Sequence, residues 1–170
     1  MYFSNGFYLY ILNLSQMYSA QEISKQKQTF WTAFGKYMQP ILSAEELPVT
    51  WVNYKTGVPG ISFRMDADDK RVSIAIVISS SDPSRQQALY NRLTQMKQMI
   101  GEALGEKDWV WQASGPDEYG RMVSSVSKQL KGLSIHRQED WPAMISFLKP
   151  RIIALDAFWS AGRYGFEELI

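Results

Sequence analysis

Carboxylates that could hold a metal ion are the first candidates for chemistry in this sequence. Asp66, Asp68 and Asp69 follow a D-x-D-D spacing that resembles the start of a calcium-binding loop. The next two residues are Lys70 and Arg71, and the glycine and the distal glutamate of an EF-hand loop are missing. We therefore interpret this stretch as a solvated turn between two strands, and we expect no metal site.

The histidine and cysteine content restricts the remaining chemistry. The chain contains one histidine, His136, and no cysteine. This excludes disulfides, thiol nucleophiles and metal sites made of several cysteines or histidines within the chain. A lone histidine can act as an acid or a base, but His136 lies beside Arg137 near a predicted strand end, which is typical of a surface or loop residue. We assign no catalytic residue and expect no cofactor, which favours a non-enzymatic protein.

Aromatic and cationic side chains on the predicted strands could form a binding surface. Tyr54, Lys55, Arg64 and Arg121 would share one polar face or rim if their strands are neighbours. Aromatic rings interleaved with cations suit stacking together with phosphate contact. The alternative interpretation is ordinary exposed sheet residues that pair with nearby acids. The candidate binding residues are Tyr54, Lys55, Arg64, Asp66 and Arg121.

Hydrophobic periodicity predicts the elements that must position these residues. Apolar side chains at helical spacing indicate helices, and alternation of apolar and polar side chains indicates strands. The expected helices cover residues 20–41, 82–105 and 141 onward, and the expected strands cover residues 49–54, 61–66, 72–79, 109–113 and 122–129. The order α-β-β-β-α-β-β-α predicts a single α+β domain, in which a mainly antiparallel sheet of about five strands packs with three main helices.

Individual residues within these elements support further expectations. Asp82 is the expected N-cap of the second helix, and Gly105 is its expected C-terminal stop. In the strand at 72–79 large aliphatic side chains alternate with small ones, which favours a helix packed closely on the small side. Pro150 interrupts the last helix, so we expect a kink or two abutting helices. Trp141 at the start of that helix should lock it onto the sheet.

The N-terminal residues are predicted to lie outside the compact domain. Residues 1–16 are apolar but interrupted by polar side chains, and they lack the basic start and the cleavage site of a signal peptide. Ser19 and Glu22 fit a capping box for the helix predicted from about residue 20, so we expect the compact domain to begin near Met17. We divide the chain into an N-terminal extension at 1–16, a compact domain at 17–166 and a frayed tail at 167–170. The alternative is that residues 1–16 add an edge strand.

The charge balance bears on the class of partner. The chain has 18 Lys and Arg residues and 17 Asp and Glu residues, so its net charge is +1. This balance provides no general attraction to nucleic acid or to an anionic membrane. The longest apolar run near the N-terminus, residues 7–12, is far shorter than the ~20 residues of a membrane span. We expect a cytoplasmic protein with no membrane partner.

Five separate motifs resemble one known family. They are FWTAFGKYM at residues 30–38, VNYKTG at 52–57, FRMD at 63–66, EDWP at 139–142 and KPRIIALD at 149–156. In this order they are similar to an uncharacterised bacterial family, domain of unknown function 4268, over roughly residues 17–166. The resemblance implies no established activity and supplies no catalytic residue. In longer relatives such a domain can follow a nuclease-like domain, which implies a defence or DNA-transaction setting.

The predicted order of helices and strands suggests one enzymatic hypothesis, which the residues on the strands can test. The order α-β-β-β-α-β matches the core of restriction-endonuclease-like nucleases, which need an acid on the second strand and an acid-x-Lys on the third to hold Mg²⁺. Asp66 could be the first acid, but the polar face of the third strand offers only Ser73, Ala75, Val77 and Ser79. The most consistent hypothesis is a non-enzymatic binding or protein-interaction module. The alternative is a degenerate restriction-endonuclease-like protein that contacts nucleic acid.

Overall fold

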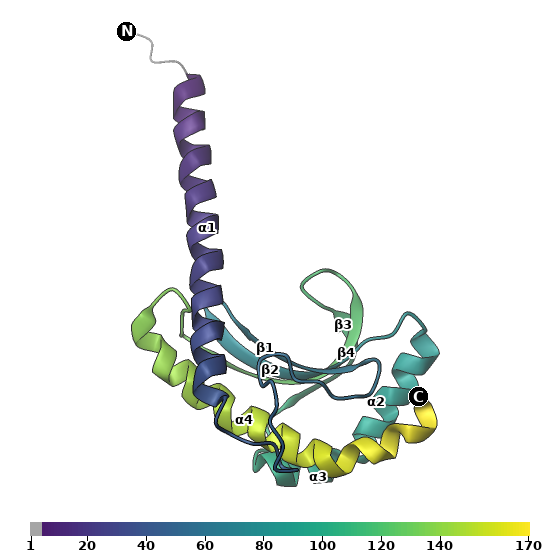
Figure 1. The fold of residues 1–170 in the computed structure, drawn as a ribbon. Coiled ribbons are helices and arrows are strands. Elements are labelled where there is room, and N and C mark those ends of the chain that lie inside the picture. The colour runs from purple at the N-terminus through teal and green to yellow at the C-terminus, as the bar shows by residue number, and fades with distance from the viewer. Residues whose placement is uncertain (1–4) are drawn as a thin grey trace.

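Alternating apolar side chains in the middle of the chain form a four-stranded antiparallel sheet. The computed structural model describes the backbone of residues 5–170 and the side chains of residues 20–170. The strands are β1 (Ile61–Ala67), β2 (Arg71–Ile78), β3 (Val110–Pro116) and β4 (Met122–Lys131). Their order across the sheet is β1-β2-β4-β3, so β1 and β3 are the edge strands (Figure 1).

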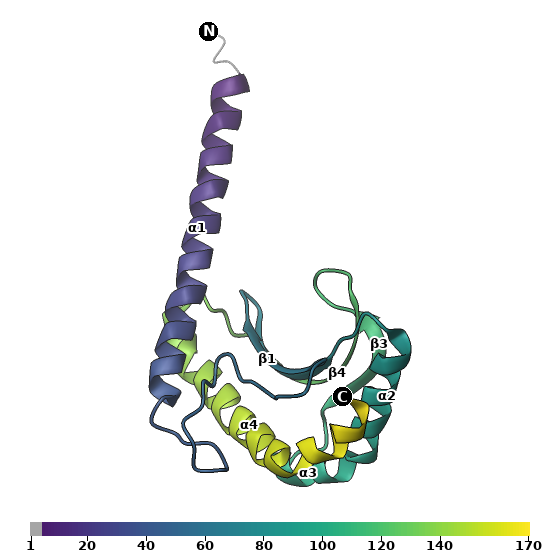
Figure 2. The same ribbon diagram turned by 45° about the vertical axis from the view of Figure 1, so that its right-hand side comes forward.

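Helices cover one face of this sheet. They are α1 (Asn5–Met38), α2 (Pro83–Gln95), α3 (Lys97–Leu104) and α4 (Trp141–Gly162), with short 3-10 segments at Gln138–Asp140 and Arg163–Leu169. α4 contacts β1 and β2, and α2 contacts β2 and β4. In Figures 1 and 2, α2, α3 and α4 lie together on the convex side of the curved sheet. The predicted α+β class with an antiparallel sheet is confirmed.

The two faces of β2 show why the helices lie on that side. Its large side chains are fully buried and belong to the core, namely Val72, Ile74, Ile76 and Ile78. Burying an aliphatic side chain contributes about 1.5–3 kcal/mol, so the helices pack where the apolar area is greatest. The opposite face carries Ser73 and Ala75, which stay partly exposed. The prediction of a helix on the small-residue side of this strand is therefore wrong.

The chain between α1 and β1 is a loop and not the strand predicted at 49–54. Trp51 places its indole in the core, where it is 2% exposed, and its Nε1 donates a hydrogen bond to the carbonyl of Ile41 (3.0 Å). The hydroxyl of Tyr54 donates to the carboxylate of Asp156 on α4 (2.6 Å). These side-chain anchors outweigh the strand propensity of the segment, and the sheet has four strands where about five were expected.

α1 begins earlier than the sequence predicts. The backbone is helical from Asn5 onward, so Ser19 lies inside the helix and the helix start predicted at about residue 20 is wrong. Of the predicted extension at 1–16, residues 1–4 lie outside the described residues. Residues 5–16 are helical, so the alternative of an edge strand does not hold for them.

α1 is anchored to the rest of the protein at its C-terminal end. A helix of 34 residues is about 50 Å long. Phe30, Phe34 and Met38 are fully buried and join the main core. The N-terminal half extends well beyond the rest of the molecule in Figures 1 and 2.

The helix predicted at 82–105 has the expected ends but is divided in the middle. The Asp82 carboxylate accepts a hydrogen bond from the N–H of Ser84 (2.9 Å), which caps α2. Gly105 ends α3 in the left-handed conformation with φ of 65°. Met96, with φ of −94° and ψ of 8°, separates α2 from α3, so one predicted helix is two.

α4 is one continuous helix that includes Pro150. At its start the ring of Trp141 packs edge to face on Phe30 of α1, with 5.4 Å between ring centroids. The indole Nε1 donates to the carbonyl of Ile135 (2.7 Å). Trp141 therefore ties the start of α4 to α1 and to the loop that follows β4. After α4 the chain continues as a 3-10 helix in which Phe166 is fully buried.

Candidate binding surface

The helices leave one face of the sheet uncovered, which is concave in Figure 2, and we call it the open face. Residues that are paired across neighbouring strands point to the same side of a sheet. Ala75 therefore lies beside Ser127, and Val77 lies beside Ser125. The floor of the open face consists of Ser73, Ala75, Val77, Gln112, Ser125 and Ser127, which line a hollow of ≈ 410 Å³.

The turn between β3 and β4 forms one rim of the open face, and its charges are paired internally. The Asp117 carboxylate accepts hydrogen bonds from the N–H groups of Tyr119 and Arg121 (both 2.9 Å). It also forms an ion pair with the Arg121 guanidinium (2.7 Å), which lies over the Tyr119 ring. Desolvation alone would raise the pKa of Asp117, but the hydrogen bonds from Arg121 and from the backbone hold it below its usual value. Arg121 thus stabilises the turn.

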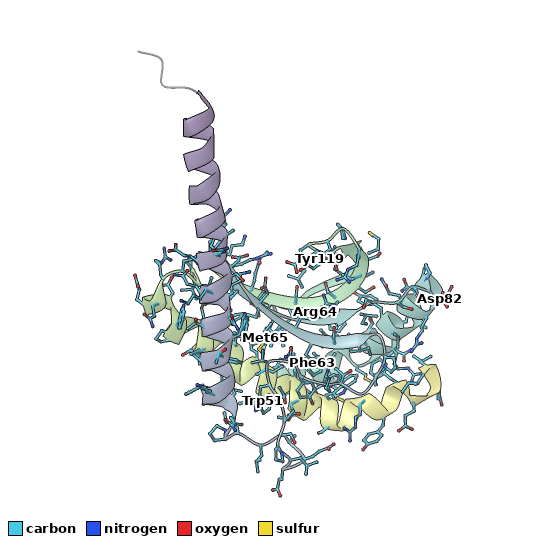
Figure 3. The ribbon with its side chains drawn as sticks, turned by 45° about the horizontal axis from the view of Figure 1, so that its top comes forward. Trp51, Phe63, Arg64, Met65, Asp82 and Tyr119 are labelled. Carbon is cyan, nitrogen blue, oxygen red and sulfur yellow. The ribbon has the colours of Figure 1, made fainter. Side chains whose placement is uncertain are left out.

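β1 carries two charges on the open face. Arg64 lies opposite Ala75, and Asp66 lies opposite Ser73. Neither Arg64 nor Asp66 forms an ion pair with another described residue. Figure 3 labels Arg64 and its neighbour in β1, Phe63. The side chain of Phe63 is buried on the helix side of the sheet. Arg64 and Asp66 therefore lie on the open face without an ion-pair partner among the described residues.

A second hollow, of ≈ 330 Å³, follows the outer edge of β1. One wall is the loop at residues 52–55, and the other is β1 at residues 62–66. We call this hollow the β1-edge channel. It shares Arg64, Asp66 and Glu118 with the open face, so the two hollows adjoin each other.

Tyr54 lies in the loop wall of the channel and is fixed from two sides. Its ring stacks on Phe63 with 5.1 Å between centroids. Its hydroxyl donates to Oδ1 of Asp156, while the N–H of Ala44 donates to Oδ2 (both 2.6 Å). Burial raises the pKa of the Tyr54 phenol well above its usual value, and the hydrogen bond to Asp156 raises it further. Tyr54 is thus a neutral anchor that holds the loop against α4.

The structure brings together most of the residues proposed from the sequence. Tyr54, Lys55, Arg64 and Asp66 all line the β1-edge channel. They meet because the loop runs beside β1, although the strand predicted for this loop does not form. Arg121 lies apart from them, in the β3–β4 turn. A binding role for these five residues stays a prediction.

The floor of the open face was missed by the sequence interpretation. Ser125 and Ser127 alternate along β4 with the buried Val126, so a period of two was present in the sequence. Gln112 occupies the matching position on β3, where it pairs with Ser125. Recognising these residues would have required knowing that the helices cover only the other face.

A network of charges lies on the helix side of the sheet. The Glu106 carboxylate forms ion pairs with Arg151 and with Lys128 (3.1 Å), and Lys128 also pairs with Asp108 (2.8 Å). Partial burial alone would raise the pKa of Glu106, but hydrogen bonds from Arg151, Trp109 and Lys128 outweigh it and hold the pKa below its usual value. This network joins the loop before β3 to β4 and to α4.

The described part of the chain contains neither a metal-binding cluster nor a helix that could cross a membrane. No three His, Asp or Glu side chains among residues 20–170 gather closely enough to hold a metal ion. His136 lies with Nδ1 at 2.6 Å from Oε1 of Gln26 on α1. None of the described helices combines the length and the apolar character that a membrane crossing requires.

A comparison of the sequence with known protein families identifies the family of this chain. The family model described as "Domain of unknown function (DUF4268)" matches residues 26–162. The chain belongs to the DUF4268 family. The open face and the β1-edge channel both lie within the matched residues, so they are parts of the DUF4268 domain. No curated protein and no solved structure matches this chain.

Proposed function

We propose that this DUF4268 domain is a non-enzymatic protein-interaction module whose open face binds a polypeptide segment. The observation that carries the proposal is the uncovered concave face (Figure 2), whose floor consists mostly of small side chains. An antiparallel sheet often leaves one face to water. Here the small floor residues allow another chain to approach the strands closely, and the β3–β4 turn provides a wall beside them.

The chemistry of the open face suits a polypeptide better than a nucleic acid. Serine hydroxyls and the Gln112 amide both donate and accept hydrogen bonds, as peptide groups do. A nucleic-acid surface needs a contiguous basic stripe with little acid beside it. In the lining of this hollow three acidic side chains, Asp66, Asp117 and Glu118, lie among an equal number of basic ones. The element order that suggested a restriction-endonuclease-like protein also differs, because residues 49–54 are not a strand. A cytoplasmic location is part of this proposal.

A random peptide library displayed on phage and selected on the purified full chain tests the proposal. The selected peptides should lose binding when Ser127→Arg places a long side chain on the floor of the open face. Met99→Arg is the matched control, because Met99 is 45% exposed on α3, on the convex side of the sheet. This control should bind the peptides as the wild type does, and both variants should melt at the wild-type temperature.

Two results would argue against the proposal. The first is a selection that enriches no peptide, and the second is a set of peptides that tolerate Ser127→Arg. A fluorescent DNA duplex titrated against the same proteins tests the nucleic-acid alternative. If the wild type binds this DNA and no peptide is enriched, the alternative replaces the proposal.

A further inference from the structure

The hydrogen bonds of the β1–β2 hairpin determine which main-chain groups of β1 face outward. At one end the N–H of Ser79 donates to the carbonyl of Gly60 (2.9 Å), and at the other the N–H of Asp68 donates to the carbonyl of Arg71 (3.0 Å). Along an antiparallel strand, residues that are hydrogen-bonded to the neighbouring strand alternate with residues whose N–H and C=O groups point to the other side. Even-numbered residues of β1 therefore bond to β2, and odd-numbered residues face the outer edge.

The outer edge of β1 is hydrogen-bonded only at its beginning. The N–H of Ile61 donates to the carbonyl of Val58 (3.1 Å), and the carbonyl of Ile61 accepts from Oγ1 of Thr56 (2.7 Å). The main-chain N–H and C=O groups of Phe63 and Met65, further along, have no hydrogen-bond partner among the described residues. Unpaired main-chain groups of this kind are a template for another strand.

The loop wall of the channel forms no hydrogen bond with these main-chain groups among the described residues. Trp51 is fixed in the core by its bond to Ile41, and Tyr54 is fixed by its bond to Asp156. The loop therefore leaves the β1-edge channel open. An added strand would lie about 4.8 Å from β1 in the direction of the hydrogen bonds.

The charges along the channel indicate the side chains that such a strand would carry. Lys55, Arg64, Asp66 and Glu118 line the channel, and none forms an ion pair with a described residue. Arg64 and Asp66 project from the same face of β1, about 7 Å apart at two residues' spacing. Opposite charges directly across a strand pair stabilise the pairing.

We propose that an extended segment of a partner protein adds to the edge of β1 as a fifth strand, with its main chain bonded to Phe63 and Met65. Main-chain bonds supply affinity in this mode of recognition, and alternate side chains supply specificity. The segment carries an acidic and a basic side chain two residues apart, which lie beside Arg64 and Asp66. This inference rests on the proposed function and specifies how the polypeptide is held at one side of the open face.

The variant Met65→Pro tests the main-chain pairing directly. It removes an N–H that faces outward and leaves the bonds between β1 and β2 in place, and proline is tolerated on edge strands. Met65→Ala is the matched control, because it removes the same side chain and keeps the N–H. With the peptides selected on the wild type, Met65→Pro should weaken binding about tenfold or more, as expected for a lost hydrogen bond. Met65→Ala should leave binding within about threefold.

Amide exchange in the wild type supplies a measurement that does not depend on how well the proline variant folds. In the free protein the amides of Phe63 and Met65 should exchange quickly, and that of Arg64 slowly. A bound peptide should protect the first two. The double variant Arg64→Asp and Asp66→Arg should select peptides in which the order of acid and base is reversed.

The outcomes separate this inference from the proposed function. One outcome would overturn strand addition and support binding at the open face alone. In it, the selected peptides no longer bind Ser127→Arg but still bind Met65→Pro, and they leave the Phe63 and Met65 amides unprotected. Peptides that tolerate both variants would overturn both proposals. Loss of binding with both variants, together with protection of the two amides, supports both.

Discussion

The substitution Tyr54→Phe removes one hydroxyl group and tests whether this residue anchors its loop to α4. The ring remains and keeps its stacking on Phe63 (5.1 Å between centroids). The lost hydrogen bond, of 2.6 Å, ends on the carboxylate of Asp156, which is 4% exposed. A hydrogen bond to a charged group contributes about 1.5–3 kcal/mol. We therefore expect the free energy of unfolding to fall by about 2 kcal/mol, from a total typical of about 5–15 kcal/mol.

Urea unfolding at pH 7, followed by tryptophan fluorescence, measures this loss. With an m-value of about 2 kcal/mol/M, the midpoint should fall by about 1 M. Tyr37→Phe is the matched control, because Tyr37 is 52% exposed and its hydroxyl accepts a hydrogen bond from Nζ of Lys149 (3.2 Å). A surface change of this kind should alter the free energy of unfolding by less than about 0.5 kcal/mol.

The pH dependence of the same pair of proteins provides a second measurement. Burial and the bond to Asp156 raise the pKa of Tyr54 in the folded state, whereas the unfolded chain releases this proton near a pKa of about 10. Above that pH the unfolded state binds fewer protons than the folded state, so the wild type loses stability as the pH rises. The phenylalanine variant lacks this loss, and the difference between the two proteins should shrink. Two results would refute the anchoring role. One is a urea midpoint of Tyr54→Phe at pH 7 equal to that of the wild type. The other is a stability difference between the two proteins that stays constant above a pH of about 10.

Three further predictions concern folding. Trp141→Ala should lower the free energy of unfolding by about 3 kcal/mol, the lower end for buried aromatic residues, because its ring packs on Phe30; a wild-type urea midpoint would assign Trp141 to a surface role instead. Glu106→Gln should cost about 1–3 kcal/mol at pH 7, because Arg151 loses its partner. The pKa of Glu106 is lowered in the folded state. The wild type should therefore lose its extra free energy of unfolding over Glu106→Gln as the pH falls below about 4.3. A difference in free energy of unfolding that does not change with pH would contradict the charge pairing. A chain that begins at Met17 should melt at the wild-type temperature in calorimetry, and a drop of many degrees would show that the preceding residues are integral to the fold.

Local patterns in the sequence were sufficient to locate most elements. Alternation predicted β1 and β2 because side chains of a strand point to opposite faces in turn. Asp82 and Gly105 predicted the ends of the second helical region because capping depends on neighbouring residues alone. The residues left between the strands predicted at 109–113 and 122–129 contain the turn of the β3–β4 hairpin. Each of these predictions used interactions within a few residues of the chain.

Segments whose conformation depends on distant partners were not predicted correctly. The segment at 49–54 has strand-forming side chains, yet Trp51 enters the core and Tyr54 bonds to Asp156, which is 102 residues away in the sequence. The capping box at Ser19 was overridden because the helix continues through it from Asn5. Neither outcome follows from local preference, because each depends on what else packs or extends around the segment.

The candidate surface shows the same division between sequence and tertiary structure. The sequence alone established an α+β chain of balanced charge, without cysteine and with one histidine, and it indicated Tyr54, Lys55, Arg64 and Asp66 as residues of interest. Only the tertiary structure decided that helices cover the large-residue face of the sheet, that the small-residue face stays open, and that a loop lines the edge of β1. The physical reason is that periodicity assigns side chains to a face, whereas long-range burial of apolar area decides which face is covered.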